Sequence, residues 1–142
     1  MFCLGVSLAV DADQAARLAE LGVDNPQRTR VDYMLNCQGC HGADGSGTAD
    51  GSVPTMKNFV GKFLSVPGGR EFIARVPGVA NAALADEPLA DLLNWVLVTQ
   101  SNAEIPDGFQ AYTPDEIAQL RQLSLQDVLE ERALLVSKMP AD

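Results

Sequence analysis

The residues Cys37, Gln38, Gly39, Cys40 and His41 form the sequence C-x-x-C-H, which constrains this chain more than any other feature. Two cysteines three residues apart lie on the same side of a helical turn, so both thiols can bond to the two vinyl groups at one edge of a porphyrin. The next residue, His41, presents an imidazole to the iron of the same ring. The motif therefore predicts one haem c, covalently bound through two thioethers to Cys37 and Cys40, with His41 as an iron ligand.

Two other kinds of site use the same cysteine spacing. A redox dithiol of the thioredoxin kind is expected after a strand in an α/β pattern, and the sequence around Cys37 shows no such pattern. A structural zinc site needs four cysteine or histidine ligands, whereas His41 is the only histidine and Cys3 the only further cysteine. Haem attachment is the interpretation that the residues support best. A zinc site and a redox dithiol are the alternatives that they leave open.

Apolar residues recur at helical spacing on both sides of the motif and predict an all-α fold. Residues 30–36 are expected to lead into the motif as a helix with Val31, Met34 and Leu35 on one face. A longer helix is expected from Asp86, which is the predicted N-cap, with Pro88 in the first turn. The apolar positions of this longer helix are Leu89, Leu92, Leu93, Val96 and Leu97.

From about Asn25 to Ser101 the chain resembles a class I mono-haem cytochrome c of the bacterial periplasmic type. The four features that carry the resemblance are the leading helix, C-x-x-C-H, the glycine-rich Gly45–Gly47 followed by Pro54, and the closing helix. The resemblance implies the cytochrome c fold, in which helices pack around the haem. It also implies that the Pro54 carbonyl accepts the second N–H of the histidine, and that Trp95 packs against the leading helix.

The sequence departs from this class at the second axial ligand of the iron. Class I cytochromes usually supply a methionine between the glycine-rich loop and the closing helix, but residues 75–84 contain neither methionine nor histidine. Met56 follows Pro54 so closely that we expect it to pack on the same side of the haem as His41. The sixth ligand is then Met56, Asn81, water or none, and a vacant or weak site predicts a lowered reduction potential.

The chain extends beyond the cytochrome-like part at both ends. Residues 1–24 are expected to hold an incomplete leader and a short helix over 11–21, and residues 25–105 the cytochrome c domain. Residues 106–142 are expected to form a helical C-terminal extension, and its first helix is expected to begin at the capping box Thr113–Glu116. A second helix is expected after Ser124, and its apolar positions are Leu125, Val128, Leu129, Leu134 and Leu135. The apolar faces of these two helices are expected to pack on the haem domain or to dock a partner subunit.

These features favour an electron carrier rather than an enzyme. We expect one electron to pass on the haem from a periplasmic dehydrogenase to an oxidase or another cytochrome that acts as terminal acceptor. One alternative is a haem with an open distal site that binds small ligands, and another is the cytochrome subunit of a larger dehydrogenase. Peroxidase chemistry is poorly supplied because the only histidine is already assigned to the iron.

Charge and hydropathy limit the classes of partner that the protein is expected to bind and the location in which it is expected to work. The formal net charge of −9 opposes binding to nucleic acid or to anionic lipid. Lys57, Lys62, Arg70 and Arg75 are candidates to steer an acidic redox partner, although solvated surface charge is the simpler interpretation of all four. No stretch is long enough to span a bilayer, and the covalent haem implies by resemblance a periplasmic protein.

Overall fold

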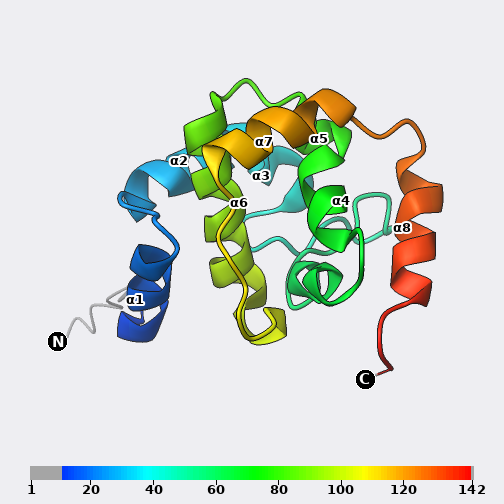
Figure 1. Cartoon of the computed structure of the whole chain (residues 1–142), viewed down its shortest axis with the longest axis horizontal. Helices are drawn as coiled ribbons and strands as arrows, with labels where there is room; N and C mark the ends of the chain where they lie inside the picture. The colour runs from blue at the N-terminus through cyan, green and yellow to red at the C-terminus, as the bar shows by residue number, and fades with distance from the viewer. Residues whose placement is uncertain (1–10, 142) are drawn as a thin grey trace, which may run out of the picture.

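The computed structural model describes residues 11–141, and it is built from helices with no strand in that range (Figure 1). The all-α fold class predicted from the sequence is therefore confirmed. The α-helices are α1 (Ala12–Glu20), α2 (Pro26–Asn36), α3 (Gln38–His41), α4 (Gly69–Arg75), α5 (Pro77–Ala80), α6 (Asp86–Ser101), α7 (Pro114–Leu120) and α8 (Val128–Ser137). Three 3₁₀ segments are η1 (Val60–Ser65), η2 (Asn102–Glu104) and η3 (Arg121–Leu123).

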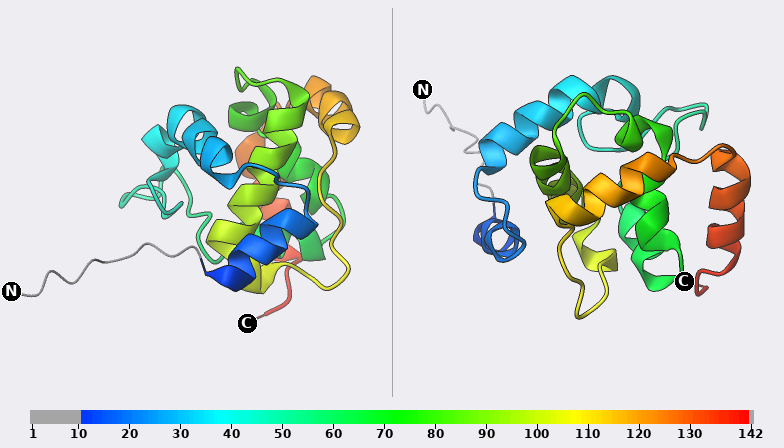
Figure 2. Two further views of the ribbon diagram at one scale, coloured as in Figure 1. Left: turned by 90° about the vertical axis from the view of Figure 1, so that its left-hand side faces the viewer. Right: turned by 45° about the horizontal axis from the view of Figure 1, so that its top comes forward.

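The longest helix, α6, is the centre of the molecule. It packs against α1 and α2 on one side, and against α7 and η1 on others (Figure 2). All of its predicted apolar positions are buried, namely Leu89, Leu92, Leu93, Val96 and Leu97. The predicted closing helix is thus confirmed, together with the packing of Trp95 against the leading helix, because its ring lies 5.3 Å from that of Tyr33 on α2.

The start of α6 differs from the prediction. The N-cap is Ala85, which has no capping side chain, whereas Asp86 is the first residue of the helix. Its carboxylate accepts a bond from Nη1 of Arg121 at 2.9 Å instead of turning back to the helix amides. A carboxylate in the first turn still complements the positive end of the helix dipole, so Asp86 contributes by charge rather than as a cap.

The leading helix presents a different face to the core from the one predicted. The exposed fractions of the three expected apolar residues are 48% for Val31, 50% for Met34 and 77% for Leu35. The buried residues of α2 are Thr29, Asp32 and Tyr33. The helix is turned so that the large ring of Tyr33 meets Trp95, and this contact outweighs the burial of three smaller apolar side chains.

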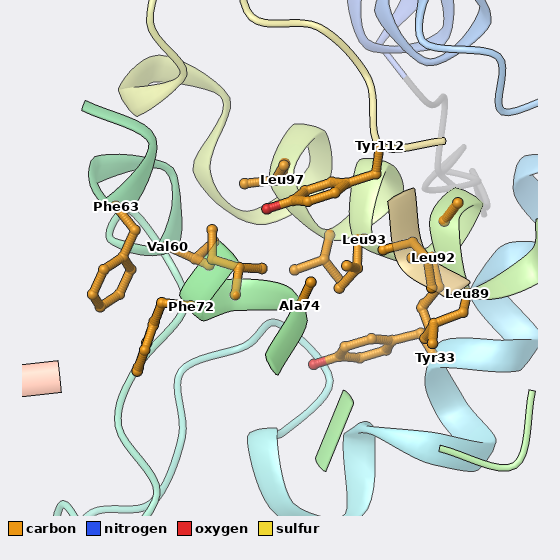
Figure 3. Close-up of a cluster of buried hydrophobic side chains, with 14 of the residues drawn as sticks. Tyr33, Val60, Phe63, Phe72, Ala74, Leu89, Leu92, Leu93, Leu97 and Tyr112 are labelled. Atoms are coloured by element: carbon orange, nitrogen blue, oxygen red, sulfur yellow. The ribbon is translucent and has the colours of Figure 1, made fainter. Parts of the chain in front are cut away.

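The C-terminal extension shares the main apolar core (Figure 3). Tyr112, Ile117 and Leu135 are buried in the same cluster as Tyr33 and the leucines of α6. The expectation that the extension packs back on the haem domain is confirmed. The division of the chain at residue 105 stays a prediction.

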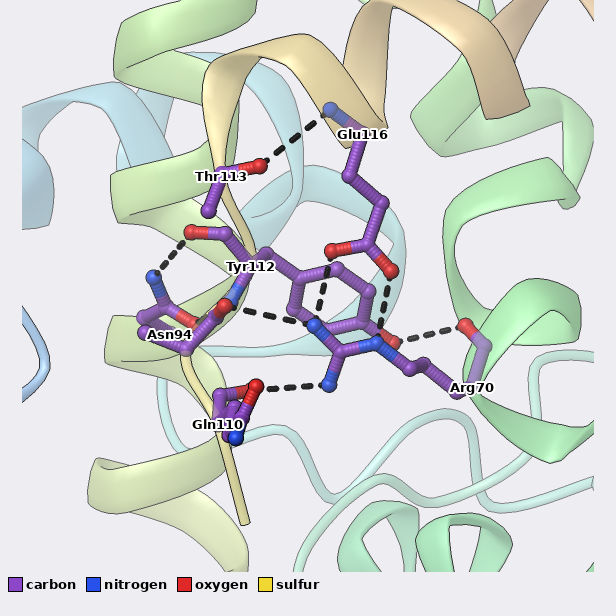
Figure 4. Close-up of polar contacts among 7 residues, drawn as sticks. Arg70, Asn94, Gln110, Tyr112, Thr113 and Glu116 are labelled. Atoms are coloured by element: carbon purple, nitrogen blue, oxygen red, sulfur yellow. Dashed lines mark hydrogen bonds and ion pairs between the residues drawn. The ribbon is translucent and has the colours of Figure 1, made fainter.

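A polar network fastens the start of the extension to the core (Figure 4). The Asn94 side chain on α6 both accepts from and donates to the backbone of Tyr112, at 2.9 and 3.1 Å. The Arg70 guanidinium on α4 donates to both carboxylate oxygens of Glu116, at 2.6 and 2.7 Å, and lies 4.3 Å from the ring centroid of Tyr112. These buried and partly buried bonds fix the position of α7 against α4 and α6.

The predicted helices of the extension form with three corrections. Thr113 caps α7 by accepting the amide of Glu116, but the Glu116 carboxylate binds Arg70, so only half of the capping box forms. The next helix, α8, begins four residues after Ser124. Its apolar set is divided, because Leu135 is buried while Leu129 and Leu134 are exposed.

The N-terminal helix also forms as predicted. Asp11 caps α1, and Leu18 packs with Leu21, Val23 and Val98 in a second small core beside α6. The proposed leader remnant and Cys3 lie outside the described residues.

Candidate haem-binding site

The C-x-x-C-H motif winds into a single helical turn. Cys37 closes α2 with a bond from its amide to the Tyr33 carbonyl at 2.9 Å, and it also begins α3. The Cys37 carbonyl in turn accepts the amides of Cys40 and His41, at 3.2 and 2.9 Å. Both thiols are free, with Cys37 partly buried and Cys40 exposed. This is the helical geometry that the spacing predicts for two thiols that bond to one edge of a porphyrin.

The environment of Cys37 argues against a redox dithiol. Burial, with a smaller contribution from the neighbouring Cys40, raises the pKa of the Cys37 thiol to about 11. A thiol of this pKa is protonated at neutral pH and is a poor nucleophile in disulfide exchange. The residues that surround Cys37 therefore keep its thiol protonated rather than activating it.

The His41 ring holds a buried atom that lacks a partner. Its Nδ1 is inaccessible to solvent and forms no hydrogen bond with the described residues. Burial also lowers the pKa of the imidazole and so favours the neutral form, which is the form that binds metals. An orphaned buried nitrogen next to two free thiols fits a site completed by a bound group. The bond to the Pro54 carbonyl is not formed here and stays a prediction.

The glycine-rich loop brings Pro54 back towards the motif. The Gly47 amide donates to the His41 carbonyl at 2.9 Å, and the Thr48 amide donates to the Val53 carbonyl at 3.0 Å. Gly47 has a φ of 75°, and a Cβ at this position would overlap the Val53 carbonyl and lie 3.0 Å from that of Pro54. Glycine is therefore required where the two sides of the loop meet. The loop places Pro54 beside the backbone that holds His41.

Two known proteins resemble this chain over most of its length. One is a Cytochrome c-552 of Thermus thermophilus that is 32% identical over 134 residues, which cover 80% of this chain and 90% of the relative. A second Cytochrome c-552 from the same species is 32% identical over 119 residues, which cover 70% of this chain and 90% of the relative. The chain belongs to the class I mono-haem c-type cytochromes. No family model and no solved structure matches it.

Membership of this family makes the cytochrome an iron-containing haem protein of electron transport. The zinc alternative finds no support in residues 11–141, where no group of three or more histidine, cysteine or acidic side chains is placed to hold a metal ion. No helix in the same residues is long and apolar enough to cross a membrane.

Tyr33 supports residues 37–41, the predicted attachment turn of the cytochrome, in a way that the sequence did not indicate. Its hydroxyl donates to the Gly42 carbonyl at 2.6 Å, directly after the histidine, and its side chain is almost fully buried. The tyrosine therefore ties α2 to the end of α3 while its ring packs on Trp95 of α6. The spacing of residues along the helix gave no signal for Tyr33, because apolar residues flank it on other faces.

All four cations suggested for partner steering make contacts within the described residues. Arg70 binds Glu116, and Arg75 donates from Nε to the Leu123 carbonyl at 2.7 Å. These contacts make both arginines part of the fold, and the steering of an acidic partner by any of the four cations stays a prediction. Lys57 pairs with Asp44 at 2.8 Å in the glycine-rich loop of the cytochrome, and Lys62 lies over the ring of Phe59.

The residues considered for the sixth ligand lie in two separate places. Met56 is partly buried against the main core, and its amide donates to the Gly45 carbonyl at 2.7 Å. Asn81 is exposed and closes the short helix α5. Val76, Val79, Ala82 and Leu84 of the same segment are partly buried against the core.

Proposed function

We propose that this cytochrome carries one electron on a single haem c, bound by thioethers to Cys37 and Cys40, with His41 as an axial ligand of the iron. The observation that carries the proposal is the single turn in which both free thiols adjoin a histidine with an unsatisfied buried nitrogen. The bound haem supplies an iron that exchanges one electron between its ferrous and ferric states.

The chain's own residues orient the histidine. The Cys37 carbonyl holds the His41 amide, and the Gly47 amide holds the His41 carbonyl, so the backbone of the ligand is fixed on both sides. With haem bound, the Pro54 carbonyl would accept the Nδ1 proton of His41, and Nε2 would then be the nitrogen available to the iron. An imidazole fixed in this way would move little between the two oxidation states, which would lower the reorganisation energy of electron transfer.

The partners proposed are a periplasmic dehydrogenase as donor and an oxidase or another cytochrome as acceptor. Cys40 is exposed, so a group bonded to its thiol reaches the protein surface, where a partner can approach. Electron-transfer encounters bury little area, and a small exposed patch is sufficient for them. The periplasmic location rests on the covalent attachment, which implies maturation outside the cytoplasm. Leu123, Leu129 and Leu134 of the extension are exposed, as a cytochrome subunit of a larger dehydrogenase would require.

A second candidate function is the binding of a small ligand to the iron. Residues 75–84 contain no methionine or histidine, and Asn81 on this segment is exposed. We propose that Met56 packs on the histidine side, so that the distal position is filled by Asn81, by water or by nothing. A weak or vacant distal position gives a lower reduction potential and admits carbon monoxide.

Redox titration of the haem-loaded protein, combined with the spectrum of its oxidised form, tests the proposal. Carrier function predicts a reversible one-electron transition, and His41→Ala is expected to abolish it or shift its potential strongly while the haem stays attached. A red thioether-to-iron charge-transfer band would contradict the weak distal site. A protein that takes up no electron in this titration would contradict the carrier function.

A further inference from the structure

We propose that Arg121, on the C-terminal extension, is a positioning residue that anchors the segment from Ala80 to Asp86 in the place of an axial methionine. The inference rests on the proposed function, because it treats this segment as the one opposite His41. In a methionine-ligated relative the bond to iron would hold the corresponding segment. Here a guanidinium group holds it from outside.

The Arg121 side chain forms four hydrogen bonds, all with this segment. Nε donates to the Ala80 carbonyl at 3.1 Å and Nη2 donates to the Ala82 carbonyl at 2.7 Å. Nη1 donates to the Leu84 carbonyl at 2.8 Å and to Oδ1 of Asp86 at 2.9 Å. Alternate carbonyls along the segment thus converge on one planar group, which matches the fixed fork of arginine donors.

The bonds satisfy backbone groups that the fold itself leaves without partners. Helix α5 has only four residues, so its last carbonyls have no intrahelical donors, and Ala80 is its final residue. Asp86 is the first residue of α6. Arg121 therefore joins the end of one helix to the start of the next. Its side chain is only 15% exposed, so the bonds are largely protected from water.

The extension also holds the beginning of the segment. The Leu125 amide donates to the Arg75 carbonyl at 3.0 Å, while Nε of Arg75 donates to the Leu123 carbonyl at 2.7 Å. Residues 121–125 of the extension are thus hydrogen-bonded to the segment 75–86 at both of its ends, at Arg75 and at residues 80–86. The segment between has one short helix, and a helix of four residues is unstable alone.

In the haem-loaded protein these contacts should control how easily the segment opens. With Arg121 in place the segment keeps one conformation whether or not a ligand occupies the iron. Without it, the four acceptors lose their partner and the segment opens locally at a lower free energy than the rest of the fold. Opening would expose the distal side and speed the entry of small ligands.

Hydrogen exchange on the haem-loaded full chain tests this inference directly. The reporting amides are those of Asn81 and Ala82, which donate to the carbonyls of Pro77 and Val79 at 3.0 and 3.1 Å. In Arg121→Gln both amides are expected to exchange at least about tenfold faster than in the wild type. Arg121→Lys keeps the positive charge but loses the planar set of donors, and it is expected to raise the exchange rate of the two amides by less. Carbon monoxide should bind the ferrous Arg121→Gln protein several-fold faster.

Arg132→Gln is the matched control. Arg132 is also an arginine of the extension, but it lies over the rings of Phe59 and Phe63, at 5.2 and 5.9 Å from their centroids. This variant should leave the exchange of the two reporting amides unchanged. Equal exchange rates in wild type, Arg121→Gln and Arg121→Lys would overturn the inference, as would a similar increase in Arg132→Gln.

Wild-type exchange keeps the inference testable if the Arg121 variants do not fold. The anchor predicts that the Asn81 and Ala82 amides are protected nearly as well as amides in the middle of α6, and rapid exchange there would contradict it. A wild-type protein without haem would contradict the proposed function. A haem-loaded protein with a mobile segment would contradict only the role of Arg121.

Discussion

Two buried tyrosines illustrate how single residues fix this fold through one polar atom each. Tyr33 donates to the Gly42 carbonyl at 2.6 Å beside the attachment turn, and Tyr112 donates to the Arg70 carbonyl at 2.7 Å where the extension begins. Each ring contributes apolar burial, while each hydroxyl selects a single register for the chain around it. Both residues connect segments that are distant in the sequence or differ in secondary structure.

Alkaline pH should destabilise the protein through Tyr112. Burial raises the pKa of its hydroxyl well above the usual value of about 10. The unfolded chain therefore binds fewer protons than the folded one above pH 10, and stability falls as pH rises, by about 1.4 kcal/mol per pH unit for one group. Tyr112→Phe should flatten this fall in urea unfolding between about pH 9 and 11.5. An unchanged slope would show that Tyr112 ionises freely in the folded state.

The loop that carries Pro54 should tolerate a side chain at one glycine and not at another. Gly47 and Gly51 have φ values of 75° and 76°, so alanine strains the backbone equally at both. Only at Gly47 does an added Cβ overlap a carbonyl, whereas nothing lies within 4 Å at Gly51. Gly51→Ala should cost about 1 kcal/mol in chemical unfolding, and Gly47→Ala about 2 kcal/mol more. Equal losses would contradict the close approach at Gly47.

At this scale the sequence predicts the site where the signal is local. Cys37, Cys40 and His41 fall within one turn, so their spacing alone indicates their geometry. Tyr33 could not be singled out, because its structural role depends on contacts with Trp95 and with the Gly42 carbonyl. The spacing of apolar residues does not reveal these contacts. The apolar neighbours Met34 and Leu35 gave the stronger hydropathy signal and are exposed.

Among the helices, α8 offers the sharpest test of packing. Leu134 and Leu135 are adjacent, but their exposed fractions are 50% and 2%. Leu135→Ala should destabilise the protein by about 2 to 4 kcal/mol, because it opens a cavity in the main core. Leu134→Ala should change the free energy of unfolding by less than about 0.5 kcal/mol. Similar losses in the two variants would mean that α8 packs by another face.

Helix boundaries were predictable where the cap is a local interaction. Asp11 and Thr113 accept amides within two or three residues of themselves, and both helices begin as predicted. Asp86 has the same local chemistry, but its carboxylate is bound by Arg121, which lies 35 residues further along the chain. A long-range ion pair therefore replaced a local cap, and no pattern near Asp86 indicates it.

For the molecule as a whole, the extension and the haem domain should unfold together. Tyr112, Ile117 and Leu135 are buried in the core that also contains the leucines of α6, so neither part can lose its partner and stay packed. Calorimetry of the haem-loaded chain is expected to give one transition with equal calorimetric and van't Hoff enthalpies. Two resolved transitions would show that the extension is an independent domain.

The contacts that join the extension to the core could not be predicted from the sequence, for a physical reason. Arg70 and Arg75 are consistent with solvated surface charge, as most arginines are, and nothing near Arg121 singles it out. The acceptors of these arginines are mostly backbone carbonyls, which every residue has and which leave no mark in a sequence. The fold class, the helices and the attachment turn follow from local patterns. The hydrogen bonds that hold residues 75–86 depend on the tertiary structure.

Covalent attachment of one haem is the central claim, and intact-mass spectrometry measures it most directly. The full chain should be produced with its export and haem-attachment machinery, alongside a variant in which Cys37 and Cys40 are both replaced by alanine. We predict a mass gain of one haem that survives denaturation in the wild type, and no such gain in the variant. A denatured wild-type chain with the mass of the bare polypeptide would contradict the account.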